Sequence, residues 1–199
     1  ERTLMEKVAA NKPSAVSLLK VQYRMHEDIM RFSSNWFYDG ELEAAPEIRH
    51  RGILDWDTPV TWIDTSDMDF KEEFVGETFG RINKEEAHLL LKELEAYILR
   101  IGGSRILEER IDFGLISPYK AQGSATLRPY RSLITVNTVD GFQGQERDVI
   151  FISLVRANEE GQIGFLNDLR RMNVAITRAR MKLVILGEAA TLGHHAFYK

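Results

Sequence analysis

The stretch DVIFISLV, at residues 148–155, decides the fold. It is short, apolar and rich in β-branched residues, which is typical of a strand that is buried on both faces of a parallel sheet. Three other runs share this character, namely FGLIS at 113–117, SLITVNTV at 132–139 and KLVILG at 182–187. A helix expected at about 167–180 separates the last strand from the stretch quoted first. Strands that alternate with helices predict an α/β fold, in which helices cover both faces of a parallel sheet.

The amino-terminal half of the chain adds further elements to this core. Apolar runs and helical spacing predict strands at 16–21 and 60–64 and helices at 26–38 and 83–100. The last helix has Asn83 as its N-cap and Glu86 three residues later, which predicts a capping box. These elements fit one domain built around a single sheet.

The composition bounds the class of protein. The 199 residues are 44% hydrophobic, which suits one domain with a sizeable core, and 26 Lys and Arg against 30 Asp and Glu give a net charge of −4. The absence of cysteine excludes disulfides and cysteine-ligated metal sites, and it fits a reducing compartment. The wholly apolar runs are too short to cross a bilayer, so no membrane partner is expected. Because the chain begins with Glu1 and not with Met, we expect it to be part of a longer protein.

Positive charge is concentrated in LRRMNVAITRAR, at residues 169–180, which has four arginines and no acid. On a helix, Arg171 and Arg178 are seven residues apart and would share one flank. Their guanidinium groups could then reach an anion together, and planar bidentate donors suit phosphate. A solvated or salt-bridged helix flank is the alternative interpretation.

A glycine-containing loop, TVDGFQGQERD at residues 138–148, follows a predicted strand. Gly141 and Gly144 would let backbone N–H groups approach a phosphate or a sugar closely. Gln143 and Glu146 carry side chains that hydrogen-bond to hydroxyl groups. A tight turn between strands would also explain both glycines. No GxxxxGK[ST] phosphate-binding loop occurs in the chain, so the groups that hold a nucleotide's β-phosphate and Mg²⁺ are not here.

Two shorter motifs stand at the ends of predicted elements. VQYRMH at 21–26 places Tyr23, which could stack on a base, beside Arg24, which could reach a phosphate. ISPYKAQ at 116–122 ends a strand with hydroxyl, ring and ammonium groups, which suit contacts to a nucleic-acid backbone. The alternative interpretation is that Tyr23 is buried, that Arg24 is an ordinary surface residue, and that ISPYKAQ ends in ordinary polar loop residues.

Taken together and in this order, the motifs carry a resemblance. VQYRMH, NKEEA, ISPYKAQ, VNTVDGFQGQERDVIFISLVRAN and GFLNDLRRMNVAITRARMKLVILG closely resemble superfamily 1 helicases of the up-frameshift type, over about residues 7–187. These helicases have two RecA-like domains with ATP bound between them. The resemblance implies that residues 1–199 are the second domain alone. The amino-terminal RecA-like domain, with its P-loop and Mg²⁺-binding acids, is not in this sequence.

The resemblance also implies roles at the nucleotide. Tyr23 would stack on the adenine, and Arg24 would contact the γ-phosphate. Glu146 would bind the ribose, with Gly144 close to the nucleotide. The cofactor would be ATP with Mg²⁺, and the missing domain would hold most of the metal's ligands.

The remaining roles concern catalysis and the nucleic acid. Arg178 would be the arginine finger, and Arg171 would lie near it. Ser117, Pro118 and Thr138 would line the path of single-stranded DNA or RNA. The capping-box residues match a family position whose role we interpret as structural.

The sequence therefore predicts the carboxy-terminal motor domain of an ATP-dependent helicase, located in the cytoplasm, or in the nucleus of a eukaryote. The domain would be inactive alone and would work with the amino-terminal domain of the same protein. A non-catalytic nucleic-acid-binding or regulatory module with the same fold is the alternative. An independent small NTPase is a third reading, which the absent P-loop disfavours.

One connection is short for this fold. Between Ser117 and Ser132 the chain reads PYKAQGSATLRPYR, which is little more than the dozen residues that a crossover between parallel strands needs. We expect these strands to be parallel neighbours, and we expect a break in the chain between Gln122 and Gly123. An engineered Gly-Ser joint and a shortened crossover are the alternatives.

Overall fold

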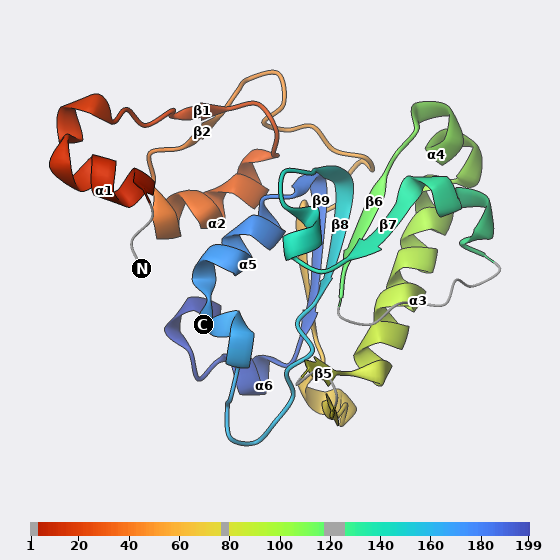
Figure 1. Ribbon diagram of the computed structural model, residues 1–199. Helices are drawn as coiled ribbons and strands as arrows, with labels where there is room; N and C mark the ends of the chain where they lie inside the picture. The colour runs from red at the N-terminus through yellow and green to blue at the C-terminus, as the bar shows by residue number, and fades with distance from the viewer. Residues whose placement is uncertain (1–3, 77–79, 118–125) are drawn as a thin grey trace.

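A five-stranded sheet forms the centre of the computed structural model, which describes residues 4–76, 80–117 and 126–199. The strand order is β3-β9-β8-β6-β7, and every neighbouring pair is parallel (Figure 1). The strands are β3 (Val60–Asp64), β6 (Phe113–Ile116), β7 (Ile134–Asn137), β8 (Arg147–Ser153) and β9 (Ala179–Gly187). The α/β fold predicted from the apolar runs is confirmed.

Helices cover both faces of this sheet (Figure 1). Along β8, Val149 and Phe151 point into one apolar core, and Ile150 and Ile152 point into the other. Successive strand residues face opposite sides, so a wholly apolar strand requires a core on each side. The first core packs against α3 (Lys84–Ile101) and α4 (Gly103–Glu109). The second packs against α2 (Glu27–Phe37), α5 (Leu169–Ile176) and α6 (Ala189–Leu192).

Small elements lie outside the central sheet. Helix α1 (Leu4–Asn11) precedes a two-stranded parallel pair, β1 (Val21–Gln22) and β2 (Glu43–Ala44), and an antiparallel hairpin joins β4 (Glu73–Val75) to β5 (Gly80–Ile82). The strand predicted at 16–21 is wrong except for its last residue. The side chain of Leu19 is 84% exposed, so this apolar run has no core to pack against.

Helix α3 begins as predicted, but its capping box is not closed. The side chain of Asn83 accepts a hydrogen bond from the backbone N–H of Glu86 at 2.9 Å. The carboxyl of Glu86 does not return to the helix start: Oε1 accepts from the Ser153 hydroxyl and from the backbone N–H of Val155. The buried turn after β8 needs an acceptor for these donors, and Glu86 supplies it.

The cramped crossover joins parallel neighbours, as predicted. Strands β6 and β7 pair in parallel, with Phe113 opposite Ile134. A 3-10 turn at Arg128–Leu133 precedes β7, so this strand is shorter than the run 132–139. The break expected between Gln122 and Gly123 lies outside the described residues.

The helix predicted at 167–180 is shorter than expected. Helix α5 ends at Ile176, where Thr177 closes it by donating its backbone N–H to the carbonyl of Asn173 at 3.0 Å. Strand β9 begins at Ala179, which pairs with Arg147 of β8. The last residues of the predicted helix therefore join the sheet, because a strand partner is available there.

Candidate functional site

Two residues predicted to act at a nucleotide stand at the amino ends of neighbouring strands. Glu146 directly precedes β8, and Arg178 directly precedes β9. These strands are parallel neighbours, so their first residues lie at the same edge of the sheet. The backbone N–H of Arg147 donates to the carbonyl of Arg178 at 2.9 Å, which fixes the two strand starts side by side.

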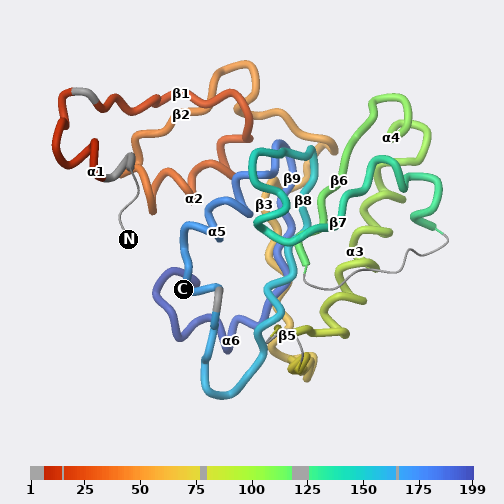
Figure 2. Tube along the Cα trace, viewed as in Figure 1, coloured from red at the N-terminus to blue at the C-terminus, as the bar shows by residue number. Residues whose placement is uncertain are grey.

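The segment that carries the aromatic candidate meets the same edge. The backbone N–H of His26 donates to the carbonyl of Arg180 at 2.8 Å, which sets the chain before α2 beside the start of β9 (Figure 2). Arg24 forms an ion pair with Glu146 and also donates to the carbonyl of Thr177 at 3.3 Å. The ring of Tyr23 is 67% exposed, so it is available to a flat ligand.

Arg178 is held by the backbone of its surroundings. Its Nε donates to the carbonyl of Val174 and its Nη1 to the carbonyl of Gln145, each at 3.0 Å. Burial lowers the pKa of Arg178, the positive charge of Arg24 lowers it further, and Glu146 opposes this. Three charged side chains therefore share one small region: Arg24, Glu146 and Arg178.

Arg180 belongs to this edge as well, although the sequence assigned it no role. Its guanidinium contacts Glu146 at 3.1 Å, Asp148 at 2.9 Å and Asp112 at 3.0 Å. Burial would raise the pKa of Glu146, but Arg180 and Arg24 together hold that pKa below its usual value. The sequence did contain a sign of this cluster, because its three acids stand at or just before the starts of predicted strands.

The two loop glycines have local explanations. Gly144 has a φ of +77°, which favours glycine, and a Cβ there would meet nothing within 4 Å. At Gly141 a Cβ would lie 2.2 Å from the side chain of Asn137. The turn geometry accounts for both residues, so neither by itself indicates a bound phosphate.

Two residues predicted for the nucleic-acid path, Ser117 and Thr138, directly follow β6 and β7 and so lie at the opposite, carboxyl edge of the sheet. Ser117 and Thr138 line a cavity of about 210 Å³, and Arg171 lines it with them. Arg171 donates from Nη2 to Oδ2 of Asp140 at 2.9 Å. Pro118, predicted for the same path, lies outside the described residues.

Arg171 and Arg178 have different partners in the structure, Arg171 on Asp140 and Arg178 on the backbone of Val174 and Gln145. Arg171 is in the first turn of α5, whereas Arg178 follows the end of that helix. Seven residues of helix span about 10 Å at 1.5 Å per residue. Arg171 lines the cavity beside Ser117 and Thr138, whereas Arg178 stands where β9 begins, so the two residues lie toward opposite edges of the sheet.

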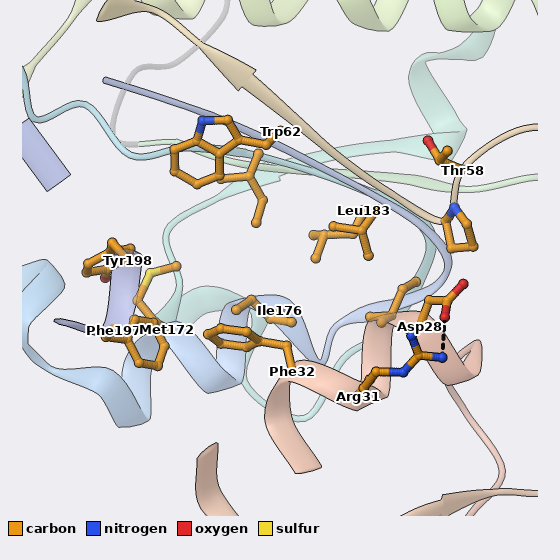
Figure 3. Close-up of a pocket in the computed structure, with 14 residues that line it drawn as sticks. Asp28, Arg31, Phe32, Thr58, Trp62, Met172, Ile176, Leu183, Phe197 and Tyr198 are labelled. Atoms are coloured by element: carbon orange, nitrogen blue, oxygen red, sulfur yellow. Dashed lines mark ion pairs between the residues drawn. The ribbon is translucent and has the colours of Figure 1, made fainter. Parts of the chain in front are cut away.

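A separate cavity of about 530 Å³ lies between α2, α5, β3, β9 and the carboxy-terminal residues (Figure 3). Most of its lining is apolar and includes Phe32, Trp62 and Phe197. Asp28 and Arg31 stand at its rim and pair with each other at 2.8 Å. It contains none of the residues predicted for nucleotide or nucleic acid.

Neither a metal cluster nor a membrane span is found in the part of the chain that the structure describes. Within residues 4–76, 80–117 and 126–199, no group of three or more His, Cys, Asp or Glu side chains could hold a metal ion. No described helix is long and apolar enough to cross a membrane.

The cations and carboxylate at the amino edge fit a nucleoside triphosphate, which offers phosphates to arginine and hydroxyls to Glu146.

Comparison with known proteins gives consistent relatives. Residues 1–190 match the model of the AAA domain family. The chain is 36% identical over 197 residues to "Probable helicase MAGATAMA 3" of Arabidopsis thaliana, covering 92% of this chain and 24% of that protein. It is 34% identical over 200 residues to "Helicase sen1" of Schizosaccharomyces pombe, covering 96% and 12%. It is 37% identical over 188 residues to "Regulator of nonsense transcripts 1 homolog" of Drosophila melanogaster, covering 87% and 15%.

The chain thus spans a quarter or less of the length of these three relatives. The family match covers almost all of the chain, and the parallel sheet with helices on both faces is the fold that the resemblance implied. The chain belongs to the AAA domain family, as a carboxy-terminal RecA-like domain of superfamily 1 helicases of the up-frameshift and Sen1 type.

Proposed function

We propose that this chain is the second motor domain of an ATP-dependent helicase, and that it completes an ATP site with an amino-terminal RecA-like domain of the same protein. One observation carries the proposal: Arg24, Glu146 and Arg178 converge at the amino edge of the sheet, although they are far apart in sequence. The exposed ring of Tyr23 stands next to this group in the chain.

Each side chain has a distinct task in this proposal. The ring of Tyr23 stacks on the adenine, and Glu146 accepts hydrogen bonds from the ribose hydroxyls. Arg24 contacts the γ-phosphate. Arg178 stabilises the charge that develops on the phosphoryl group during transfer to water, which is the task of an arginine finger. Mg²⁺, when bound, neutralises charge between the phosphates and is held mainly by acids of the other domain.

The division of the site between two domains explains why the arginines are here. The sequence contains no P-loop, so this chain supplies no cradle for the β-phosphate. Closure of the two domains brings Arg24 and Arg178 to the triphosphate, and opening removes them. ATP hydrolysis is thereby coupled to the relative position of the domains.

The opposite edge of the sheet is the proposed path of single-stranded DNA or RNA. Ser117 and Thr138 contact the backbone there, and Arg171 adds a positive charge at the same cavity. Helix α5 runs from Arg171 to the turn before Arg178, so one rigid element joins the two edges. Motion at the nucleotide is transmitted through this helix. The protein would work in the cytoplasm or nucleus, where its substrate is found.

A non-catalytic nucleic-acid-binding or regulatory module remains the second candidate. It would use the carboxyl edge alone and would have no need of Arg24, Glu146 and Arg178 together. ATP hydrolysis stimulated by a nucleic-acid strand separates the two functions.

The test uses a protein that carries this chain behind its amino-terminal domain. Steady-state ATP hydrolysis is measured with and without single-stranded DNA and RNA, and unwinding is measured on a duplex with a single-stranded tail. We expect strand-stimulated hydrolysis and unwinding, both lost in a variant with Arg24→Ala. Binding of the strand without any ATP hydrolysis would favour the non-catalytic module.

A further inference from the structure

Arg180 forms ion pairs with three carboxylates at the amino edge of the sheet, where β8 and β9 begin. Its Nε donates to Oδ1 of Asp148 at 2.9 Å, and its Nη1 donates to Oε1 of Glu146 at 3.1 Å. Its Nη2 donates to both carboxyl oxygens of Asp112, at 3.0 and 3.2 Å. Every nitrogen of the guanidinium donates to a carboxylate, so the positive charge of this arginine is already shared among three acids.

The acids around Arg180 are themselves fixed to the sheet. The backbone N–H of Asp112 donates to the carboxyl of Asp148 at 3.1 Å, and the backbone N–H of Asp148 donates to the carboxyl of Asp112 at 2.6 Å. This reciprocal pair joins the start of β6 to the start of β8. Arg180 therefore lies in a rigid cradle, and the one acid that reaches outward from it is Glu146.

Glu146 is divided between two arginines. Oε1 accepts from Arg180, whereas Oε2 pairs with Arg24. A carboxylate oxygen has two lone pairs, so acceptor capacity remains for the hydroxyls of a sugar. The bond from Arg180, which is held by two further acids, limits the rotation of the carboxyl.

We propose that Arg180 is a positioning residue that orients the Glu146 carboxylate toward the ribose hydroxyls of the bound nucleotide. This inference rests on the proposed function, because it assumes that Glu146 binds the ribose. Arginine is required because its planar fork reaches three carboxylates at once, and the single ammonium of lysine does not. A merely structural salt bridge would affect stability without changing which sugars the site prefers.

The experiment measures how strongly the site depends on the sugar hydroxyls. The KM for ATP and for 2′,3′-dideoxy-ATP is determined in the protein that carries both RecA-like domains, for Glu146→Gln, Arg180→Lys and Arg180→Gln. We expect the dideoxy nucleotide to have a KM about tenfold higher than ATP in the unchanged protein, as the loss of a hydrogen bond to a charged group implies. Each variant should lower this ratio toward one.

Controls separate geometry from stability. Arg105→Gln removes an arginine that pairs with Glu109 at 2.9 Å and donates to the carbonyl of Ile53, and that contacts none of the acids around Arg180, so it should keep the ratio. Arg180→Lys retains the positive charge in the cradle, and its thermal unfolding is compared with that of the unchanged protein. If Arg180 acts through Glu146, the double variant with both Gln substitutions should have the ratio of Glu146→Gln alone.

The outcomes distinguish the positioning role of Arg180 from the ribose role of Glu146, on which it rests. An unchanged ratio in Glu146→Gln would overturn the ribose role of Glu146, and with it that part of the proposed function. A lowered ratio in Glu146→Gln with the full ratio in Arg180→Lys would overturn only the positioning role of Arg180.

Discussion

Arg178 donates from Nη1 to the backbone carbonyl of Gln145 at 3.0 Å, and this bond ties the residue before β9 to the loop before β8. In a second hydrogen bond, Nε of Arg178 donates to the carbonyl of Val174, which belongs to the last turn of α5. The guanidinium is thereby fixed at the junction of a helix, a loop and two strands. A group that must meet a transition state benefits from such fixed placement, because little reorganisation is needed during the reaction.

Replacement of Arg178 should separate catalysis from binding. In the two-domain protein we expect Arg178→Ala to lower kcat for ATP hydrolysis by about a thousandfold or more, while nucleotide affinity falls much less. Arg178→Lys keeps the charge without the fork and should remain strongly impaired. Steady-state kinetics and fluorescent-nucleotide titration measure the two quantities. A kcat that stays within about threefold of the original would exclude the arginine-finger role.

Replacement of Tyr23 should have the opposite signature. Tyr23→Ala removes a stacking surface worth about 1–3 kcal/mol and should raise KM for ATP about five- to a hundredfold with little change in kcat. Tyr23→Phe keeps the ring and serves as the matched control. The side chain is largely exposed, so the midpoint of thermal unfolding should not move. An equal rise in the KM for ATP in Tyr23→Ala and Tyr23→Phe would show that the hydroxyl group, and not the ring, contributes to binding.

Arg171 tests which edge of the sheet meets the nucleic acid. Its place beside Ser117 and Thr138 predicts that Arg171→Gln weakens strand binding and lowers the slope of log K against log salt by about 0.7 to 0.9. The KM for ATP should stay the same. Arg31→Gln, on α2, is the control for loss of one charge. A rise in the KM for ATP with an unchanged salt slope would indicate that Arg171 acts at the nucleotide and not at the nucleic acid.

The isolated chain should not hydrolyse ATP. Residues 1–199 contain no P-loop motif, so we expect turnover far below the ~1 s⁻¹ of an ordinary enzyme. The assay is steady-state phosphate release from the purified chain, with single-stranded DNA or RNA present. The Arg178→Ala form of the same chain gives the background. Turnover at the ordinary level, abolished by that substitution, would contradict a site shared with another domain.

Glu86 should give the stability of the domain a distinct pH dependence. Burial raises the pKa of Glu86, in spite of hydrogen bonds from Ser153 and Val155, and its Oε2 has no hydrogen-bond partner among the residues that the structure describes. The folded state then holds this proton to higher pH than the unfolded state does, whose pKa is about 4.3. The free energy of unfolding must therefore fall as the pH rises from that value through the raised pKa of the folded state.

Urea unfolding between about pH 4.5 and 8 measures this effect. Glu86→Gln cannot titrate, so its stability relative to the unchanged chain should rise with pH. Glu85→Gln, an exposed neighbour in the same turn, should run parallel to the unchanged chain. Glu86→Ala leaves the Ser153 hydroxyl and the Val155 N–H without their acceptor and should cost about 1–3 kcal/mol for each. Parallel pH profiles for Glu86→Gln and the unchanged chain would show that the carboxyl does not titrate in this range.

The sequence by itself determined the sheet. The runs at 113–117, 148–155 and 182–187 are apolar at every second position and also between, so each needs a core on both faces. Helix α3 was equally predictable, because an apolar stripe and Asn83 as its cap are local features. The motifs also gave Tyr23, Arg24, Glu146 and Arg178 through a resemblance. The parallel strand starts explain why Glu146 and Arg178 meet, whereas the contact of the segment before α2 with β9 appears only in the tertiary structure.

Only the tertiary structure decided where α5 ends and which partners the charged residues have. Apolar residues at 172, 175, 176 and 179 fit a continuing helix, but pairing with β8 draws Ala179 into a strand. That change moves Arg178 and Arg180 to the amino edge and leaves Arg171 at the carboxyl edge. Side-chain partners such as Arg180 with Asp112, or Glu86 with Ser153, join positions far apart in the chain. Local periodicity cannot reveal them, because burial and a free donor or acceptor at the same place in space select them.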